Sequence, residues 1–265
     1  MKHRMKAFPG IFAAWFVLGA AFVADKAAGG ETRSQYEQPK LRAATIYEAN
    51  SDKKHILYKF TRTVTQSGPV AKVLREFSYP DDKVAARERI VYDGDNLVAY
   101  ELEELQINAR GGVKVWRDRK TPGKGHLTFD YVTDTNSSSK TNSNTESLRL
   151  DTLVGDMTSV FVVSHWDDLM KGKAVKCRLI AAARTETFGF TFEKHAESTW
   201  QGKPAVVIKL SPSSFIINAL VNPLYFTMEK DGEHRVLQCD GRTTPKIKAG
   251  NKWKDLDAVT VFDWD

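Results

Sequence analysis

Apolar side chains recur at every second position over most of this chain, and this alternation constrains the fold more than any other feature. It is first seen at Ile56, Tyr58, Phe60 and Val64, which alternate with mostly polar residues. A β-strand with one buried face has this period of two, whereas a helix repeats about every 3.6 residues. We therefore predict about twelve strands. Clear further examples lie at residues 71–79, 90–92, 97–107, 127–131, 175–181, 188–192, 206–210, 224–228 and 259–264.

Short turns separate the expected strands, among them Ser67-Gly68-Pro69 and Asp93-Gly94-Asp95-Asn96. Turns of this length join antiparallel neighbours. A sheet of about twelve twisted strands curls into a barrel or splits into two packed sheets. The sequence thus predicts a mainly β protein: a curved antiparallel sheet that forms a half-open or closed barrel, with one or two short helices packed on its concave side.

Two segments favour helices. Residues 153–170 place apolar side chains near helical spacing and are followed by Gly172, a residue common just beyond a helix end; Val160–Val163 within them is also compatible with a strand. Residues 211–225 contain a run that is apolar on nearly every side between two prolines. Such a helix is buried or covers something apolar, so it is either a core element or a lid over a cavity.

The chain divides into three expected parts. Residues 1–24 carry a basic start and an apolar run of about sixteen residues, shorter than the roughly 20 that span a bilayer, which indicates a cleavable signal peptide; an uncleaved anchor is the alternative. Residues 25–42 read as a flexible leader. Residues 43–265 form a single β-rich domain with a mobile loop at 134–147, where Ser, Thr and Asn dominate. We expect a periplasmic or secreted protein with no stable membrane span after signal removal.

An oxidising compartment permits Cys177 and Cys239 to form a disulfide, since both lie in expected strands. The alternative is two separate buried thiols, and the sequence does not decide between them.

A curved sheet has a concave apolar face, and a barrel of this size can enclose a ligand. We therefore expect a non-enzymatic protein that binds a lipid-like or other apolar small molecule, without cofactor or metal. The residues expected to line the ligand site come from three segments. They are Phe161 of the expected helix, Phe188, Phe190 and Phe192 of one expected strand, and Phe215, Ile216, Ile217 and Leu220 of the apolar run.

Two other functions are weaker. Basic clusters at residues 114–124 and 246–254 are either solvated strand faces or the contact surface of a scaffold or assembly factor. Such a factor would contact an envelope protein or an anionic lipid or polysaccharide surface, whereas export argues against nucleic acid as the partner. Ser164, His165 and Asp168 form the compact cluster with catalytic residue types, but adjacent residues on a helix do not face each other. A hydrolase is therefore the least favoured reading, and no catalytic residue is assigned.

The order of signal peptide, strands, mid-chain helix and further strands resembles exported Gram-negative proteins of domain-of-unknown-function families. The resemblance includes the closing segment, from Pro223-Leu224-Tyr225-Phe226 through Leu237 to Gly241-Arg242. More distantly the chain is similar to the Lol-type lipoprotein carriers, whose half-open barrel holds acyl chains under short helices. That similarity covers roughly residues 43–265 in architecture and implies a carrier of apolar cargo, but it assigns no functional residue.

Overall fold

The strands of this protein form one large curved sheet. The computed structural model describes residues 41–118, 120–121, 123–134, 138–214 and 221–264. In this part of the chain, fifteen strands follow the order β8-β7-β6-β5-β4-β3-β2-β1-β15-β14-β13-β12-β11-β10-β9. Neighbouring strands are antiparallel, apart from the parallel pair β9–β10. The predicted fold class is confirmed: a mainly β protein with a curved antiparallel sheet and a few short helices.

The first and last strands meet in the middle of the sheet, because β1 (Leu41–Glu48) pairs with both β2 and β15. This divides the rest into two arms. The first arm consists of β2 (Ile56–Ser67), β3 (Val70–Ser78), β4 (Val84–Asp93), β5 (Asn96–Glu104), β6 (Ala109–Arg117), β7 (Gly125–Asp134) and β8 (Ser139–Ser147). The second arm consists of β15 (Lys252–Trp264), β14 (Val236–Ala249), β13 (Leu224–Glu229), β12 (Lys203–Pro212), β11 (Glu186–Trp200), β10 (Val175–Ala181) and β9 (Thr152–Leu153).

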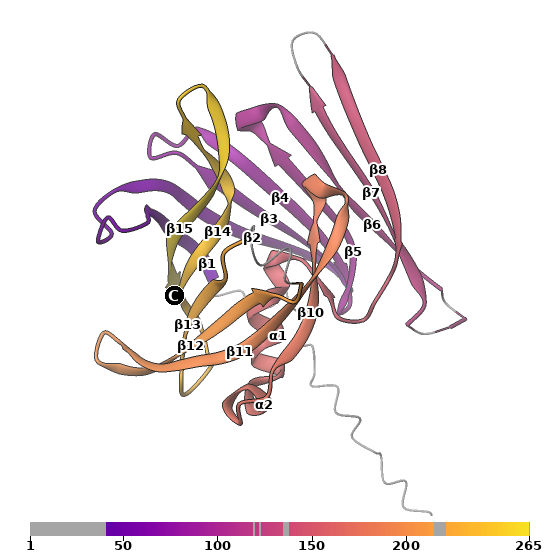
Figure 1. Cartoon of the computed structure of the whole chain (residues 1–265). Coiled ribbons are helices and arrows are strands. Elements are labelled where there is room, and N and C mark those ends of the chain that lie inside the picture. Colours follow the sequence, from indigo (N-terminus) through magenta and orange to yellow (C-terminus); the bar gives the residue numbers. More distant parts are fainter. Residues whose placement is uncertain (1–40, 119, 122, 135–137, 215–220, 265) are drawn as a thin grey trace, which may run out of the picture.

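The sheet curls until its two arms face each other across a short helical segment (Figure 1). That segment contains the 3-10 turn η2 (Gly155–Met157) and helices α1 (Thr158–Ser164) and α2 (Trp166–Met170). At one edge of the sheet, Glu146 on β8 accepts hydrogen bonds from the backbone N–H and the hydroxyl of Thr187 on β11, at 3.1 and 2.6 Å. Asn144 also donates to the carbonyl of Thr185 at 2.9 Å. Side chains therefore connect β8 to the opposite arm.

Two apolar cores fill the concave side. The smaller core lies between β1–β4 and β15 and includes Ile46, Phe60, Phe77 and Leu256. The larger core joins the other inward faces of both arms to the helical segment, through residues such as Val73, Ile90, Phe129, Met157, Phe192 and Ile208. The period-two alternation of the sequence thus buries one face of each long strand against one of these cores.

The predicted helix at residues 153–170 is confirmed in its centre, and Val160–Val163 is helical rather than extended. It is shorter than expected, since Leu153 belongs to β9 and the chain bends at His165. The cause of the bend is local: the Ser164 hydroxyl and His165 Nδ1 both bond to the carbonyl of Phe161, at 2.8 and 2.9 Å. These side-chain bonds compete with the regular helical ladder.

The predicted loop at residues 134–147 is wrong for most of its length, because Ser139–Ser147 forms strand β8 along β7. Its polar composition has a different explanation. β8 is an edge strand, and polar or charged side chains protect an exposed edge from pairing with other chains.

Two further boundaries differ from expectation. β1 begins at Leu41, so the last two residues of the expected leader belong to the sheet. The strand expected at residues 97–107 ends at Glu104, and the 3-10 turn η1 (Leu105–Ile107) follows it. The expected signal peptide at residues 1–24 lies outside the described residues. Within the described residues, no helix has the length and apolar character that crossing a membrane requires.

Candidate functional site

A row of charged side chains crosses the concave face where the two cores meet. Arg62 on β2 lies directly opposite Arg75 on β3, and Arg75 lies directly opposite Glu88 on β4. On each of these three strands, the charged residue lies between two inward-facing apolar residues, one of which packs in the smaller core and the other in the larger core. These neighbours are Phe60 and Val64, Phe77 and Val73, and Ala86 and Ile90. The row therefore separates the smaller core from the larger one.

Asp156 on η2 completes this row, and we call Arg62, Arg75, Glu88 and Asp156 the charged belt. Arg62 Nε donates to Asp156 Oδ1 at 2.8 Å and Arg62 Nη2 donates to Oδ2 at 3.1 Å. The hydroxyl of Tyr92 on β4 donates to the same Oδ2 at 3.1 Å. The side chains of Arg62 and Asp156 are only 2% and 3% exposed. This is a desolvated, two-pronged guanidinium–carboxylate pair, the strongest geometry for such a contact.

Asp156 also resolves an electrostatic conflict in the sheet. Two arginines directly opposite each other on neighbouring strands repel, and Arg62 and Arg75 are in that position. The Asp156 carboxylate bonds to Arg62 and lies 3.9 Å from Arg75 Nε. One carboxylate from the helical segment thus lies close to both buried guanidinium groups.

Glu88 forms the other half of the belt and links the two arms. Arg75 Nη1 donates to Glu88 Oε2 at 2.6 Å, and the Thr244 hydroxyl on β14 donates to Oε1 at 2.6 Å. Burial, followed by the nearby Glu88 carboxylate, raises the pKa of Tyr100 well above its usual value. Burial and the neighbouring Asp156 do the same for Tyr92. Both phenols therefore stay protonated and can act as hydrogen-bond donors at any physiological pH.

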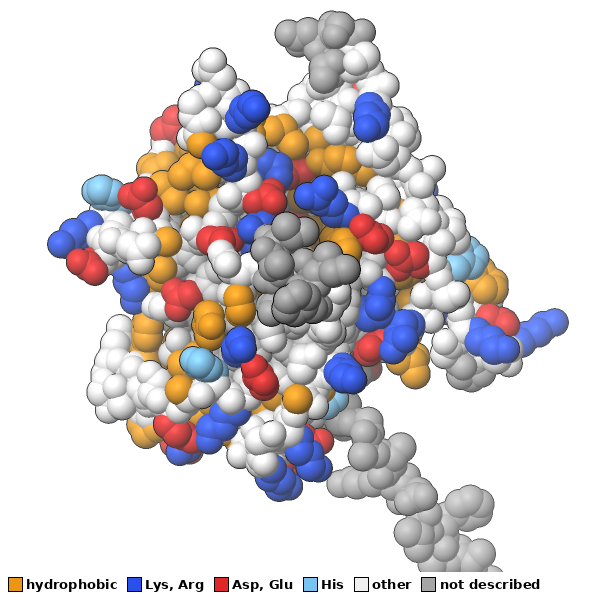
Figure 2. Space-filling view, viewed as in Figure 1, with side chains coloured by type: hydrophobic (Ala, Val, Ile, Leu, Met, Phe, Trp, Pro, Cys, Tyr) orange, Lys and Arg blue, Asp and Glu red, His pale blue; other side chains and the backbone are white. Residues whose placement is uncertain are grey.

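A second polar cluster joins β5 and β7 to β14 and β15. Lys246 Nζ lies 3.1 Å from Glu104 and 2.9 Å from Asp255, and the Tyr131 hydroxyl donates to Glu104. Although burial alone lowers the pKa of Lys246, bonds to Asp255 and Glu104 raise it overall. Figure 2 shows acidic and basic side chains interleaved around the centre of the viewed face. Opposite charges thus hold the two arms together here.

Gln106 on η1 extends this cluster. Its amide nitrogen donates to the hydroxyls of Tyr58 and Tyr79, each at 2.9 Å, and its amide oxygen accepts from the backbone N–H of Lys246 at 2.7 Å. Burial raises the pKa of Tyr58 to about 12. The Gln106 amide and the two tyrosine hydroxyls thus add an uncharged, hydrogen-bonded junction to the charged cluster, which suits a structural role better than proton transfer.

The structure brings together those expected lining residues that it describes. Phe161 on α1 lies with its ring centroid 5.7 Å from that of Phe192 on β11, which is wholly buried. Phe190 shares that face of β11 and is also buried, whereas Phe188 is half-buried. A ligand between α1 and β11 would have to separate these rings. The other expected lining residues, Phe215, Ile216, Ile217 and Leu220, lie outside the described residues.

The residues considered for hydrolysis do not form a catalytic arrangement. Ser164 Oγ lies 3.0 Å from His165 Nδ1, but both atoms also lie within 2.9 Å of the carbonyl oxygen of Phe161, which can only accept hydrogen bonds from them. Asp168 bonds to Lys173 at 2.8 Å rather than to the histidine, and that bond lowers the pKa of Asp168. The hydrogen-bond pattern belongs to a helix end.

The possible disulfide is not formed, and the alternative of two separate thiols holds, because Cys177 and Cys239 are both free. Cys177 lies on β10 and Cys239 on β14, with three strands between them. Four strand spacings correspond to about 19 Å along the sheet, whereas a disulfide needs Cα atoms within about 7 Å. Burial raises the pKa of each thiol to about 12.

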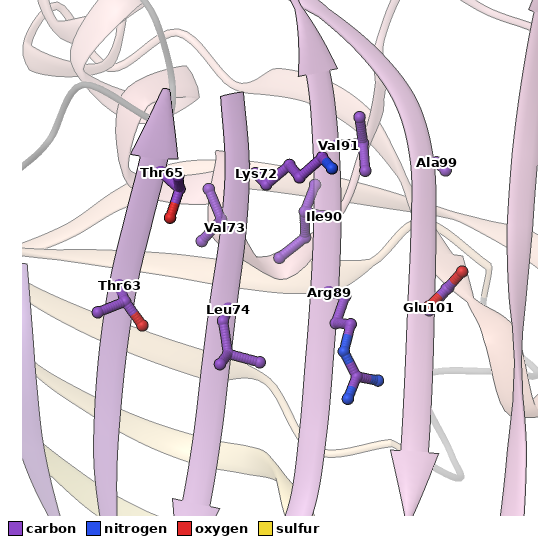
Figure 3. A pocket seen from close by; sticks show the side chains of 10 residues that line it. All are labelled: Thr63, Thr65, Lys72, Val73, Leu74, Arg89, Ile90, Val91, Ala99 and Glu101. Carbon is purple, nitrogen blue, oxygen red and sulfur yellow. The ribbon is translucent and has the colours of Figure 1, made fainter. Parts of the chain in front are cut away.

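A cavity of about 360 Å³ lies on the outer face of β2–β5 (Figure 3). Its walls mix apolar and charged side chains, and most of these residues point away from the cores. The lining residues are Thr63, Thr65, Lys72, Val73, Leu74, Arg89, Ile90, Val91, Ala99 and Glu101. The volume falls within the range of small-molecule sites, but none of the expected ligand-binding residues contributes to it.

Sequence reasoning missed the charged belt. The sequence did contain a signal for it. In each of three strands with alternating apolar residues, one position that faces inward holds a charged residue: Arg62, Arg75 and Glu88. A charge at a core-facing position requires a partner, and that requirement marks the site before the partner is known.

Comparisons with known proteins add little to this description. No protein-family model matches the chain, and no curated protein matches it. One solved structure is similar, the crystal structure of a β-barrel-like protein of domain of unknown function DUF1849 from Brucella abortus. The TM-score is 0.35 at 7% sequence identity, over 84% of this chain and 92% of that chain. Such values assign no family, so the fold class rests on the strand pairing described above.

Proposed function

We propose that this chain is an exported, non-enzymatic protein that binds a lipid-like or other apolar ligand on the concave face of its sheet. The observation that carries the proposal is the packing of Phe161 on Phe192, because it places a short helix over the buried aromatic face of β11. A ligand would take the place of the helix against that face.

The helical segment suits the role of a movable cover. Helices α1 and α2 have seven and five residues. Helices this short are unstable alone and depend on side-chain packing. Their separation from β11 would break side-chain contacts only, and the strand pairing of the sheet would remain. An apolar ligand could then replace the contacts that the sheet loses.

The proposed compartment is the periplasm or the extracellular space. Its support is the basic start and apolar run of residues 1–24. A fusion of residues 1–24 to a reporter that is active only after export tests this part. Retention of the reporter in the cytoplasm would contradict it.

Ligand binding can be tested by titrating the purified chain with a fluorescent fatty acid. We expect saturable binding by the native chain and a clear loss of affinity in the Phe161→Glu and Phe188→Glu variants, because each places a charge against the proposed acyl chain. Val98→Glu is the matched control, since Val98 is already 37% exposed. Absence of saturable binding by the native chain would overturn the proposal.

A second candidate function is a scaffold or assembly factor for envelope or polysaccharide machinery. It is favoured by the outer-face cavity and by Trp116, which is 53% exposed on β6 next to the cavity-lining strands. A pull-down from envelope extract separates the two functions. Stoichiometric protein partners that are lost in a Trp116→Ala variant would favour the scaffold, and co-purified lipid would favour the carrier.

A further inference from the structure

We propose that Arg62, Arg75 and Tyr92 form a binding site for the anionic headgroup of an amphipathic ligand, and that Asp156 occupies this site as a built-in substitute. The inference rests on the proposed function and names its ligand class: a single-chain lipid with a carboxylate or phosphate headgroup. The apolar chain would lie along the larger core, and the headgroup would lie at the charged belt.

The site has the donors that an anion requires. Arg62 offers two N–H groups on one edge of its guanidinium, and these are 2.8 and 3.1 Å from the Asp156 oxygens. The Tyr92 hydroxyl adds a third donor at 3.1 Å. All three donors come from strands of the sheet, whereas the acceptor comes from the separate helical segment. The sheet alone therefore presents a carboxylate-binding site.

Asp156 does not satisfy this site completely. Arg75 Nε lies 3.9 Å from Asp156 Oδ1, too far for a hydrogen bond, and it is buried without a hydrogen-bond partner among the residues that the structure describes. The other end of the same guanidinium is held by Glu88 at 2.6 Å. A phosphate, or a carboxylate free to shift toward β3, has oxygens that can reach this remaining N–H. A ligand headgroup can therefore form one bond more than Asp156 does.

One movement would free both parts of the proposed site. Asp156 immediately precedes Met157, which is buried in the larger core, and the same segment continues into α1, where Phe161 covers Phe192. Displacement of the segment would therefore uncover the anion site and the apolar face together. This coupling favours an amphipathic ligand over a purely apolar one.

Charge balance points to the same ligand class. The closed belt contains two arginines and two carboxylates, Glu88 and Asp156, so its formal charges cancel. Without Asp156 the belt retains one excess positive charge in a buried setting. A buried unpaired cation is costly, and an anionic headgroup would remove that cost.

The first experiment compares three amphiphiles of equal chain length: dodecanoic acid, dodecyl phosphate and dodecanol, each displacing the fluorescent fatty acid. We expect the acid and the phosphate to bind about tenfold or more tightly than the alcohol, because hydrogen bonds to charged groups contribute to affinity at this site. The relative affinities of the acid and the phosphate distinguish a carboxylate headgroup from a phosphate headgroup.

Two variants test the role of the belt. Asp156→Asn weakens the built-in substitute, so it should bind the acid more tightly than the native chain does. The double variant Arg62→Gln and Asp156→Asn removes both charges while keeping amides in their places, and it should lose the preference for the acid over the alcohol. If the alcohol binds as tightly as the acid in the native chain and in Asp156→Asn, the headgroup site is overturned and the proposed function stands.

A measurement without any acyl chain separates the two proposals. The unfolding temperature of Asp156→Asn should rise more in acetate or phosphate than in chloride at equal ionic strength, and the double variant should show no such difference. Equal effects of the three anions would overturn the headgroup site. If no amphiphile binds to any variant, the proposed function itself fails, whatever the anions do.

Discussion

Arg62 and Asp156 are separated by 94 positions in the chain, yet two hydrogen bonds join them in a nearly fully buried pair. The contact connects the first arm of the sheet to the helical segment between the arms. It therefore fixes where that segment lies on the concave face, and with it the position of Phe161 over β11. The chemistry of the candidate site and the stability of the fold depend on the same carboxylate.

The Asp156→Ala variant should be strongly destabilised. Removing one partner of a buried ion pair leaves an unpaired charge and typically costs about 3–5 kcal/mol. Here the change leaves Arg62 and Arg75 opposite each other without the intervening carboxylate. Urea unfolding followed by circular dichroism measures the loss. Asp167→Ala is the control, since Asp167 is an exposed residue of α2 and should change the free energy of unfolding little. Equal stability of the two variants would contradict the role of the belt.

The free thiols should be unreactive in the folded protein. Burial raises the pKa of both Cys177 and Cys239 to about 12, so almost no thiolate is present near pH 8. We expect a thiol reagent such as Ellman's reagent to label neither cysteine in the native chain. After unfolding in urea without reductant, both should react. Failure to detect two thiols under those conditions would indicate the disulfide that the structure lacks.

The alternating pattern was enough to predict most of the strands, because most carry their own evidence of burial; β8 was missed, since its side chains are almost all exposed. The pattern could not predict which strands face each other across the curled sheet. For this reason the sequence could not decide whether Cys177 and Cys239 pair: β10 and β14 are both strands, as expected, but three others separate them in the sheet. Contacts between distant strands depend on the order and curvature of the whole sheet, which no local pattern contains.

The candidate site was predictable in part. The aromatic side chains of α1 and β11 were expected to meet on the concave face, and Phe161 does pack on Phe192. The buried charges were missed, although Arg62, Arg75 and Glu88 interrupt the apolar phase of their strands. Their partner could not be identified from the sequence, because Asp156 belongs to a turn that reaches them only through the fold of the whole chain.

The ion pair between Lys246 and Asp255 should make the stability of the protein depend on pH. Although burial alone raises the pKa of Asp255, the bond to Lys246 and the nearby charge of Arg242 lower it overall. A carboxyl whose pKa is lowered on folding stabilises the protein when it is ionised. That contribution is complete above the pKa that the carboxyl has in the unfolded chain. It is lost as the pH falls through the lower pKa that the same carboxyl has in the folded chain.

We therefore expect the Asp255→Asn variant to be less stable than the native chain at neutral pH, with the difference shrinking below about pH 4. Urea unfolding at a series of pH values measures this. Asp231→Asn, on an exposed turn, should show no comparable trend. A difference between Asp255→Asn and the native chain that stays constant down to about pH 3 would contradict the assignment.

Gly112 on β6 lies where a side chain cannot fit. A Cβ atom there would lie 2.0 Å from the carbonyl oxygen of Tyr100 on the neighbouring strand, and that oxygen belongs to the backbone. The strands would have to move apart, which would disturb the β5–β6 pairing. We expect Gly112→Ala to destabilise the chain by about 1–3 kcal/mol, the usual cost of overpacking. Thermal unfolding measures the change.

Lys114→Ala, an exposed position on the same strand, should leave the unfolding temperature nearly unchanged. If both variants unfold at the native temperature, the close approach of β5 and β6 at Gly112 is not required by the fold.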